Sequence, residues 1–275
     1  MNSPIGIFDS GLGGLSVAAQ VLRALPNERI IYFADTAHVP YGERPLEEIH
    51  GFALAITQFL VDRGAKAVVM ACNMSSAVAL DEARKRHPDV PILGVIEPGV
   101  RAALAVSRGA PIGVLATTGT VNSRAYVRTA AGLDPTARIV QQACPRFVPI
   151  VEAGESDSEE AEAAACTYVH PLTAQGCATL VLGCTHYPFL RKAIESAAGP
   201  GVTVVDPAEE TALALKKILL ERGMASDRLD CPHVFCATGE SDAFAGLGSA
   251  FLGQRIDMVR RVTWGVDLGR KVSAI

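Results

Sequence analysis

The stretch "VVMACNMSSA" at residues 68–77 decides the fold, because a segment of the same plan recurs later in the chain. Its apolar run is typical of a strand buried on both faces, and it ends in Cys72 followed by Asn73. The segment "LVLGCTHYPF" at residues 180–189 is also an apolar run that ends in a cysteine, Cys184, followed by a polar residue. Each cysteine precedes the expected start of a helix, and this order is typical of a parallel sheet.

A second pair of segments supports an internal duplication. "IGIFDSGLGGLS" at residues 5–16 resembles "IGVLATTGTVNS" at 112–123, since each begins as a short strand and breaks into a polar, glycine-containing loop. The offsets nearly agree, at 113 − 6 = 107 residues for this pair and 184 − 72 = 112 for the cysteines. Two copies of one α/β unit explain this agreement better than chance does.

Strand and helix patterns alternate along the rest of the chain, which predicts parallel sheets with helices on both faces. In the first copy we expect strands at 5–11, 29–35, 65–72 and 90–96, and helices at 15–26, 46–64 and 75–88. The acidic, alanine-rich segment 152–172 is interpreted as a loop and a solvated helix, and 201–223 as a strand and a helix. Strands are also expected within 232–239 and 258–265. They could return to the first domain or close the second, and we favour their return to the first.

Composition narrows the class of protein. The chain has 275 residues, 49% of them hydrophobic, and a net charge of −4 without a basic stripe, so nucleic acid is not expected as a partner. No basic segment followed by an apolar run opens the sequence, and no apolar run could cross a bilayer. We therefore expect a cytoplasmic protein without a membrane partner, whose seven cysteines are free thiols.

A metal site is not predicted. The tightest cysteine cluster is "CPHVFC", with Cys231, His233 and Cys236. Its spacing matches no standard zinc pattern, and a fourth ligand would be needed. The simpler interpretation is a strand that carries two half-buried thiols.

The two strand-end cysteines carry the functional hypothesis. Ligands of parallel sheets bind at the carboxyl ends of the strands, and a helix N-terminus favours the thiolate form of a cysteine. A lone buried cysteine is more often a packing residue. A pair at matching positions of a duplicated unit is different, because opposed acid and base groups can remove a proton from one face of a carbon and supply one to the other.

Other loops at strand ends offer polar groups. "DSGLGG" provides Asp9, Ser10 and backbone N–H groups that could hold a carboxylate, although such a turn also serves strand–helix packing. "ATTGT" provides Thr117 and Thr120, which also suit a helix N-cap. A further polar loop, "DTAHVPYGERP", contains Pro40, Tyr41 and Gly42. His186 lies beside Cys184 in sequence, where it could tune the thiol or be structural.

These residues resemble the cofactor-independent glutamate racemases of the aspartate/glutamate racemase superfamily. The motifs that carry the resemblance run in family order from about residue 5 to 190, and the tail "VFCATGESDAF" also fits. They are "IGIFDSGLGGLSV", "IIYFADTAHVPYG", "ACNMSSAVAL", "GVIEPGVRAA", "IGVLATTGTVNS", "CPRFVPIVEAG" and "VLGCTHYPFL".

The resemblance implies two pseudo-symmetric α/β domains with the active site in the cleft between them. We expect the first domain to comprise residues 1–97 plus 208–275 and the second 98–207. It also implies an isomerase that interconverts L- and D-glutamate without pyridoxal phosphate or metal and supplies D-glutamate for peptidoglycan. Family enzymes are commonly dimers, so a homodimer is expected.

Carried over residue by residue, the resemblance implies that Cys184 takes the α-proton from L-glutamate and Cys72 from D-glutamate. Asp9 and His186 match assisting polar groups, and Glu152 matches a further acidic residue. The expected substrate contacts are Asp9, Ser10, Pro40, Tyr41, Gly42, Asn73, Thr117, Thr120 and Thr185.

Two positions depart from the family pattern. Met74 stands where threonine usually follows the asparagine, which removes a hydroxyl that Ser75 could replace as a substrate contact. His38 stands where arginine is frequent. An aspartate or other amino-acid racemase with a pocket altered at Met74 therefore stays open, as do a cysteine hydrolase that uses one cysteine and a binding protein without activity.

Overall fold

The structure is a computed structural model that describes residues 3–227, 232–239 and 241–265. It separates into two compact units. Unit 1 comprises Met1–Val95 with Thr211–Ile275, and unit 2 comprises Ile96–Glu210. That each unit is a separate domain stays a prediction.

Unit 1 is built on a sheet with the strand order β10-β9-β2-β1-β3-β4. Every strand pair described in it is parallel. β1, β2 and β3 are buried along their whole length, which explains their continuous apolar sequences. The strands are β1 (Ile5–Asp9), β2 (Ile30–Ala34), β3 (Ala67–Met70), β4 (Ile92–Gly94), β9 (Val234–Ala237) and β10 (Val259–Arg261).

Helices α2 and α3 pack together in unit 1, and α1 packs against α11. The 3-10 turn η1 lies between β2 and α2. α10 contains the boundary between the units, which falls between Glu210 and Thr211. The bounds are α1 (Leu15–Ala24), η1 (Tyr41–Glu43), α2 (Leu46–Asp62), α3 (Asn73–Arg86), α10 (Pro207–Glu221) and α11 (Ser241–Leu252).

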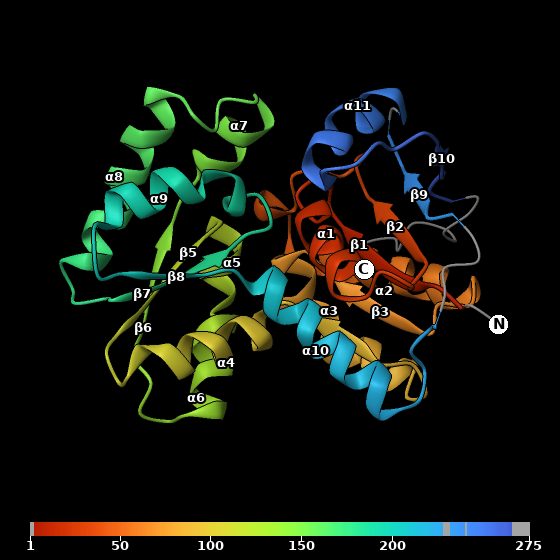
Figure 1. Ribbon diagram of the computed structural model, residues 1–275, viewed down its shortest axis with the longest axis horizontal. Coiled ribbons are helices and arrows are strands. Elements are labelled where there is room, and N and C mark those ends of the chain that lie inside the picture. Colours follow the sequence, from red (N-terminus) through yellow and green to blue (C-terminus); the bar gives the residue numbers. More distant parts are fainter. Residues whose placement is uncertain (1–2, 228–231, 240, 266–275) are drawn as a thin grey trace. The chain divides into compact units, whose positions relative to one another are not determined.

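Unit 2 repeats the centre of this design with a parallel sheet in the order β6-β5-β7-β8. Helices α8 and α9 lie on one face of the sheet, and α4 and α6 on the other (Figure 1). Its strands are β5 (Ile112–Ala116), β6 (Ile139–Ala143), β7 (Thr179–Gly183) and β8 (Thr203–Val205). Its helices are α4 (Ile96–Ser107), α5 (Thr118–Ser123), α6 (Ala125–Leu133), α7 (Phe147–Glu152), α8 (Glu159–Thr173), η2 (Tyr187–Leu190) and α9 (Arg191–Ala198).

The predicted α/β fold with two pseudo-symmetric parallel sheets is confirmed. The order β2-β1-β3-β4 in unit 1 matches β6-β5-β7-β8 in unit 2. The tail returns to the first sheet, as we favoured, because β9 pairs with β2 from Ile31↔Val234 to Ala34↔Ala237.

Two expectations for secondary structure were wrong. α3 begins at Asn73 rather than at residue 75, with Cys72 as its N-cap. α8 is not simply a solvated helix, because Ala161, Ala164, Ala165 and Tyr168 are buried along one face. Three glutamates of α8 lie in its first turn, where their negative charges interact favourably with the helix dipole and stabilise the helix. Ser158 caps α8, because its hydroxyl accepts a hydrogen bond from the Ala161 N–H.

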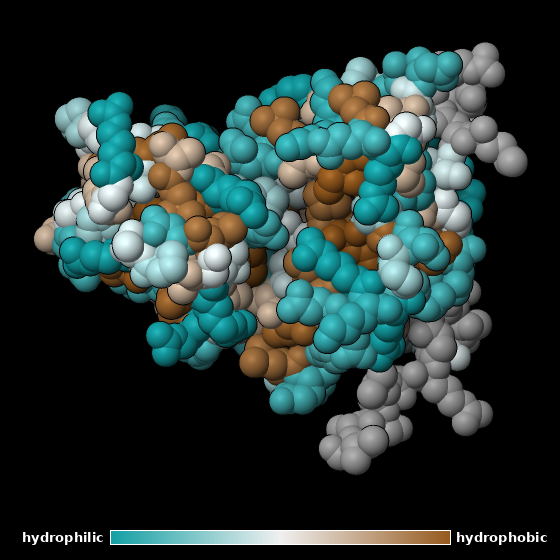
Figure 2. Space-filling model, turned by 90° about the horizontal axis from the view of Figure 1, so that it is seen from below, coloured by the Kyte–Doolittle hydropathy of each residue, from teal (hydrophilic) through white to brown (hydrophobic). Residues whose placement is uncertain are grey.

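Hydrophilic residues cover much of the face drawn in Figure 2, with apolar patches between them. Within the described residues, the longest apolar helices fall short of what a membrane crossing requires.

Candidate functional site

In unit 1, Asp9 ends β1 and is fully buried. Its Oδ1 accepts a hydrogen bond from the Gly11 N–H at 3.0 Å, and the Gly11 carbonyl accepts one from the Tyr32 hydroxyl at 2.8 Å. A Cβ on Gly14 would lie 2.4 Å from the Asp9 Cβ and 2.7 Å from the Tyr32 hydroxyl, so only glycine allows this close approach. Burial raises the pKa of Tyr32 well above its usual value, and the charges of Asp9 and Cys72 add to the rise.

Cys72 is buried at the N-cap of α3, two residues beyond the end of β3. The N-terminus of a 14-residue helix therefore follows the thiol directly, an environment that stabilises a thiolate. Ser76 fixes this junction, since its hydroxyl donates to the Met70 carbonyl at 2.8 Å and accepts from the Val95 N–H at 3.2 Å. Asn73 is also buried beside the cysteine.

Met74 belongs to a small apolar cluster with Tyr41, Ile49 and Cys72. It therefore fills space next to the cysteine, where a threonine would leave room and add a hydroxyl. The hydroxyl of Ser75 is buried and has no hydrogen-bond partner within the described structure. A buried hydroxyl of this kind is costly unless a ligand or water pairs with it.

The loop that carries Tyr41 is tied to a buried carboxylate, Asp35, which follows β2. The Tyr41 hydroxyl donates to Asp35 Oδ2 at 2.6 Å, while the Thr238 hydroxyl and the Trp264 indole N–H each donate to Oδ1 at 2.8 Å. His38 Nδ1 lies 3.0 Å from both carboxylate oxygens. Segments far apart in sequence thus meet at one carboxylate. The neighbouring loop residues are Pro40, after a cis peptide bond, and Gly42, within η1.

In unit 2, Cys184 directly follows β7 and is buried, as are Thr185 and His186. The Cys184 sulfur lies 3.8 Å from His186 Nδ1, and His186 Nε2 lies 3.3 Å from Glu152 Oε1. Glu152 ends α7 and its side chain is 42% exposed, so this carboxylate links the buried histidine to solvent. The structure therefore brings together the cysteine, histidine and glutamate predicted from the sequence.

Tyrosines and a third cysteine surround Cys184. The Tyr187 hydroxyl donates to the Cys144 carbonyl at 3.2 Å, and the Tyr187 N–H donates to the Cys184 carbonyl at 3.1 Å. Burial raises the pKa of Cys144 strongly, with a further contribution from Cys184, so the Cys144 thiol keeps its proton. Tyr126 is also buried, and its pKa is raised by burial and by Cys184 and Asp206.

Thr117 is the N-cap of α5, which was one of its two open interpretations. Its hydroxyl oxygen lies 3.0 Å from that of Thr120, and it accepts a hydrogen bond from the Thr120 N–H at 3.4 Å. Ser10, in the corresponding loop of unit 1, is buried.

The two catalytic candidates occupy equivalent positions of the two sheets. Ile5 pairs with Ala67 between β1 and β3, and Ile112 pairs with Thr179 between β5 and β7. Cys72 lies five residues after Ala67, and Cys184 five residues after Thr179.

Sequence reasoning missed Asp35, Tyr32, Cys144 and Trp264. Asp35 and Cys144 each follow a buried or half-buried strand, so the rule that selected Asp9 could have found them. Trp264 had no local signal.

Of the "CPHVFC" cluster, Cys231 lies outside the described residues. In the described part of the chain, no group of three or more His, Cys, Asp or Glu side chains is placed to hold a metal ion.

Comparison with known proteins gives the family. The family model for Asp/Glu/Hydantoin racemase matches residues 5–215. The chain belongs to this family. Membership of the racemase family makes the chain an isomerase, as the sequence predicted.

Similar proteins span nearly the whole chain. A protein of Desulforudis audaxviator named glutamate racemase is 43% identical, and the alignment covers 94% of this chain and 97% of that one. A glutamate racemase isoform of Bacillus anthracis has a crystal structure that matches with a TM-score of 0.90 at 38% identity, over 94% of this chain and 97% of that one. A glutamate racemase from Francisella tularensis, solved in complex with D-glutamate, matches with a TM-score of 0.89 at 32% identity, over 95% and 98%.

Proposed function

We propose that the chain is a glutamate racemase that uses Cys72 and Cys184 as its two acid–base groups. The observation that carries the proposal is the equivalence of these cysteines: each is buried and follows the corresponding strand of its sheet. The names of the relatives, and the D-glutamate in the Francisella structure, favour glutamate over other substrates.

The proposed reaction starts with Cys184 as thiolate and Cys72 as thiol. The Cα–H bond of L-glutamate breaks, its proton goes to the Cys184 sulfur, and its electron pair is delocalised into the α-carboxylate. The Cys72 thiol then gives its proton to the opposite face of Cα, which forms D-glutamate. The reverse reaction exchanges the two roles. This mechanism requires that both sulfurs reach one substrate carbon.

The remaining predicted residues have assisting roles in this proposal. His186, with Glu152, holds or shuttles the proton of Cys184, and Asp9 does the same for Cys72. Hydroxyl, amide and backbone N–H groups stabilise the charge that develops on the carboxylate. Tyr41 and Gly42 would donate through their backbone N–H groups, and Pro40, which has no N–H, would contact the substrate by packing alone. The proposed side-chain donors are Ser10, Asn73, Ser75, Thr117, Thr120 and Thr185.

We further propose that the enzyme works in the cytoplasm as a homodimer and supplies D-glutamate for peptidoglycan synthesis and cell shape. These points rest on the resemblance to glutamate racemases. The proposed reaction uses neither pyridoxal phosphate nor a metal.

Incubation with L-glutamate in D₂O, without added pyridoxal phosphate, tests the reaction. Following the α-proton by NMR and the enantiomers by chiral chromatography should show exchange of the α-proton together with D-glutamate. If the α-proton does not exchange and no D-glutamate forms, the proposal is excluded. L-aspartate in a parallel sample tests the sister activity at the Met74-altered pocket, and faster turnover of aspartate than of glutamate would reassign the substrate.

A further inference from the structure

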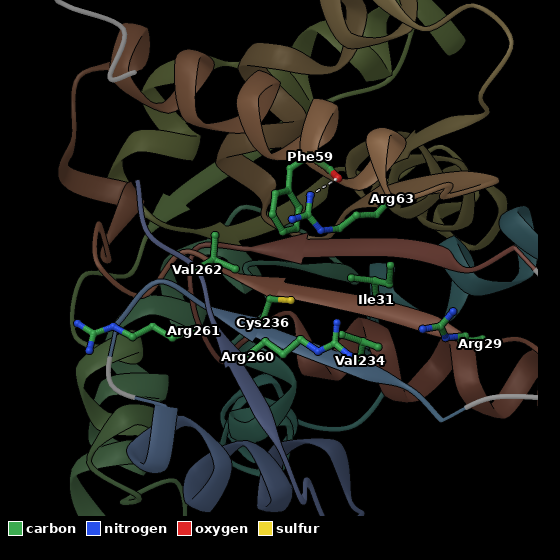
Figure 3. A pocket seen from close by; sticks show the side chains of 9 residues that line it. All are labelled: Arg29, Ile31, Phe59, Arg63, Val234, Cys236, Arg260, Arg261 and Val262. Atoms are coloured by element: carbon green, nitrogen blue, oxygen red, sulfur yellow. Dashed lines mark hydrogen bonds between the residues drawn. The ribbon is translucent and has the colours of Figure 1, made fainter. Parts of the chain in front are cut away.

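A cavity in unit 1 runs along the sheet, from Arg29 just before β2 to Val262 just after β10. It has a volume of about 290 Å³, and it is lined by β2, β9, β10 and the end of α2 (Figure 3). Arg29 precedes β2 and Arg63 directly follows α2. None of Asp9, Asp35 and Cys72 lines this cavity. The lining residues are Arg29, Ile31, Phe59, Arg63, Val234, Cys236, Arg260, Arg261 and Val262.

The charge of this cavity is strongly positive. Four of its nine lining residues are arginines and none is acidic. Within the described part of the chain, Arg63 and Arg260 form no ion pair with a carboxylate. Arginine side chains without carboxylate partners around a concave surface are typical of an anion site.

The arginines are positioned around an apolar floor. The Arg63 guanidinium lies 3.4 Å from the centre of the Phe59 ring and donates a 3.3 Å hydrogen bond to the Phe59 carbonyl, which holds it over the pocket. Figure 3 shows Arg63 on one side and Arg260 on the other, with Cys236 and Ile31 between them.

The environment of the Cys236 thiol is consistent with two guanidinium groups that face the same part of the pocket. Burial raises the pKa of the thiol, and the guanidinium groups of Arg63 and Arg260 partly oppose the rise, so both positive charges act on one place in the pocket. Stacking on an aromatic ring leaves the edge of a guanidinium free to bind a ligand in the bidentate manner.

We propose that this pocket binds a small organic phosphate. The phosphate group binds between Arg63 and Arg260, because two guanidinium groups match a doubly charged oxyanion better than a single carboxylate. The body of the ligand packs on Ile31, Val234 and Val262. A cavity of this size suits a ligand of one or two rings.

A different role explains only part of the cluster. β10 is one of the two edge strands of the described sheet, and charged residues on an edge discourage pairing with other chains. That role covers Arg260 and Arg261, but it gives no reason for Arg29 and Arg63, which come from other elements. The inference does not depend on racemase activity, because none of the lining residues belongs to the proposed catalytic machinery.

Titration with phenyl phosphate, followed through the methyl NMR signals of Ile31, Val234 and Val262, tests the proposal. We expect saturable shifts of these signals with phenyl phosphate. Benzoate and phenol should bind at least about tenfold more weakly, because benzoate carries only one negative charge and phenol carries none. No saturable shift up to about 10 mM phenyl phosphate, or equal binding of benzoate or phenol, would overturn the proposal.

Variants place the phosphate. Arg63→Gln and Arg260→Gln are each expected to weaken phenyl phosphate binding about tenfold, since each removes a charge-assisted pair. Arg222→Gln is the matched control, because Arg222 is an exposed arginine of the same unit outside the pocket. If Arg222→Gln weakens phenyl phosphate binding as much as the pocket variants do, the binding reflects general charge attraction. If neither pocket variant weakens it, the phosphate does not bind between Arg63 and Arg260, and either outcome overturns the proposal. The methyl spectrum of each variant reports whether it is folded, and Arg260→Gln changes only an exposed residue of the edge strand.

Discussion

Asp35 and Cys144 occupy the same position in the two sheets. The Asp35 N–H donates to the Asp9 carbonyl at 3.0 Å, and the Cys144 N–H donates to the Ala116 carbonyl at 2.9 Å, so each closes the end of the central strand of its sheet. Each then accepts a hydrogen bond from a tyrosine hydroxyl, in unit 1 on its carboxylate and in unit 2 on its backbone carbonyl. The duplicated unit thus keeps one mode of anchoring with different chemistry.

Replacement of Asp35 by asparagine should loosen the Tyr41 loop. Three donors would then face a neutral amide in place of a buried carboxylate, and one of them would meet an N–H group. We expect the free energy of unfolding to fall by about 1–3 kcal/mol, with a lower kcat/KM for glutamate. Urea denaturation and steady-state kinetics measure both. Asp62→Asn, at an exposed residue of α2, should stay within about 0.5 kcal/mol of the parent, and an equal loss there would contradict the assignment.

Loss of either cysteine that we propose as catalytic should almost stop racemisation. Cys72→Ala and Cys184→Ala are each expected to lower kcat by about 10²- to 10⁴-fold in both directions, because every turnover needs one group on each face of Cα. Chiral chromatography of the product mixture measures this. Cys166→Ala, at a partly exposed thiol of α8, should keep full activity. A Cys184→Ala variant that still racemises glutamate would refute the two-base mechanism.

Glu152→Gln should lower kcat only modestly. Glu152 is 42% exposed and lies 3.3 Å from His186, so solvent screens this pair. We expect a fall of about two- to fivefold, the range of a partly exposed ion pair. The difference from the parent should shrink in about 1 M salt, where the screening length is near 3 Å. The control is Glu155→Gln, which changes an exposed glutamate beyond α7 and should leave kcat unchanged.

Met74→Thr should separate packing from substrate binding. The buried methionine packs with Tyr41, Ile49 and Cys72, so its loss should reduce stability by about 1–3 kcal/mol. The new hydroxyl should at the same time lower KM for glutamate up to about tenfold, the value of one hydrogen bond. Thermal unfolding and kinetics measure the two effects. A KM that stays the same would mean that position 74 does not contact the substrate.

Alkaline pH should destabilise the protein partly through Cys236. Burial raises the pKa of this thiol to about 11, so above pH 9 the unfolded chain loses a proton that the folded chain retains. The stabilisation is complete below about pH 9 and is lost as the pH rises toward 11, by about 1–3 kcal/mol at most. The slope of unfolding free energy against pH from 9 to 11 should be shallower in Cys236→Ala than in Cys166→Ala. Equal slopes would exclude this contribution.

The sequence predicted the strands well because their signal is local. Continuous apolar runs gave the positions of β1, β2 and β3 and showed that the unit is repeated. Helix ends were harder. Cys72 caps α3 without a side-chain hydrogen bond, so the usual Ser or Thr signal pointed two residues too late. α7 has only six residues and contains Pro149, too little for a helical period to show.

In the candidate site, too, local features could be predicted from the sequence and long-range contacts could not. Cys72, Cys184 and His186 lie next to strands and were found by position. The network around Asp35 was not, because its donors Thr238 and Trp264 come from residues more than 200 positions away in the chain. Such contacts depend on the path of the tail, which local patterns leave open. The alanine-rich face of α8 was also missed, since small residues bury a helix without a strong apolar signal.

The return of the tail to the first sheet sets an order for folding during synthesis. Unit 2 has all of its described strands once Val205 has left the ribosome, whereas β2 receives its neighbour only when Val234 arrives, 203 residues after its partner Ile31. Until then β2 is an open edge with unpaired backbone groups. The part of the protein that is made first is therefore completed last, and a chain interrupted before β9 exposes a strand ready to pair with other molecules.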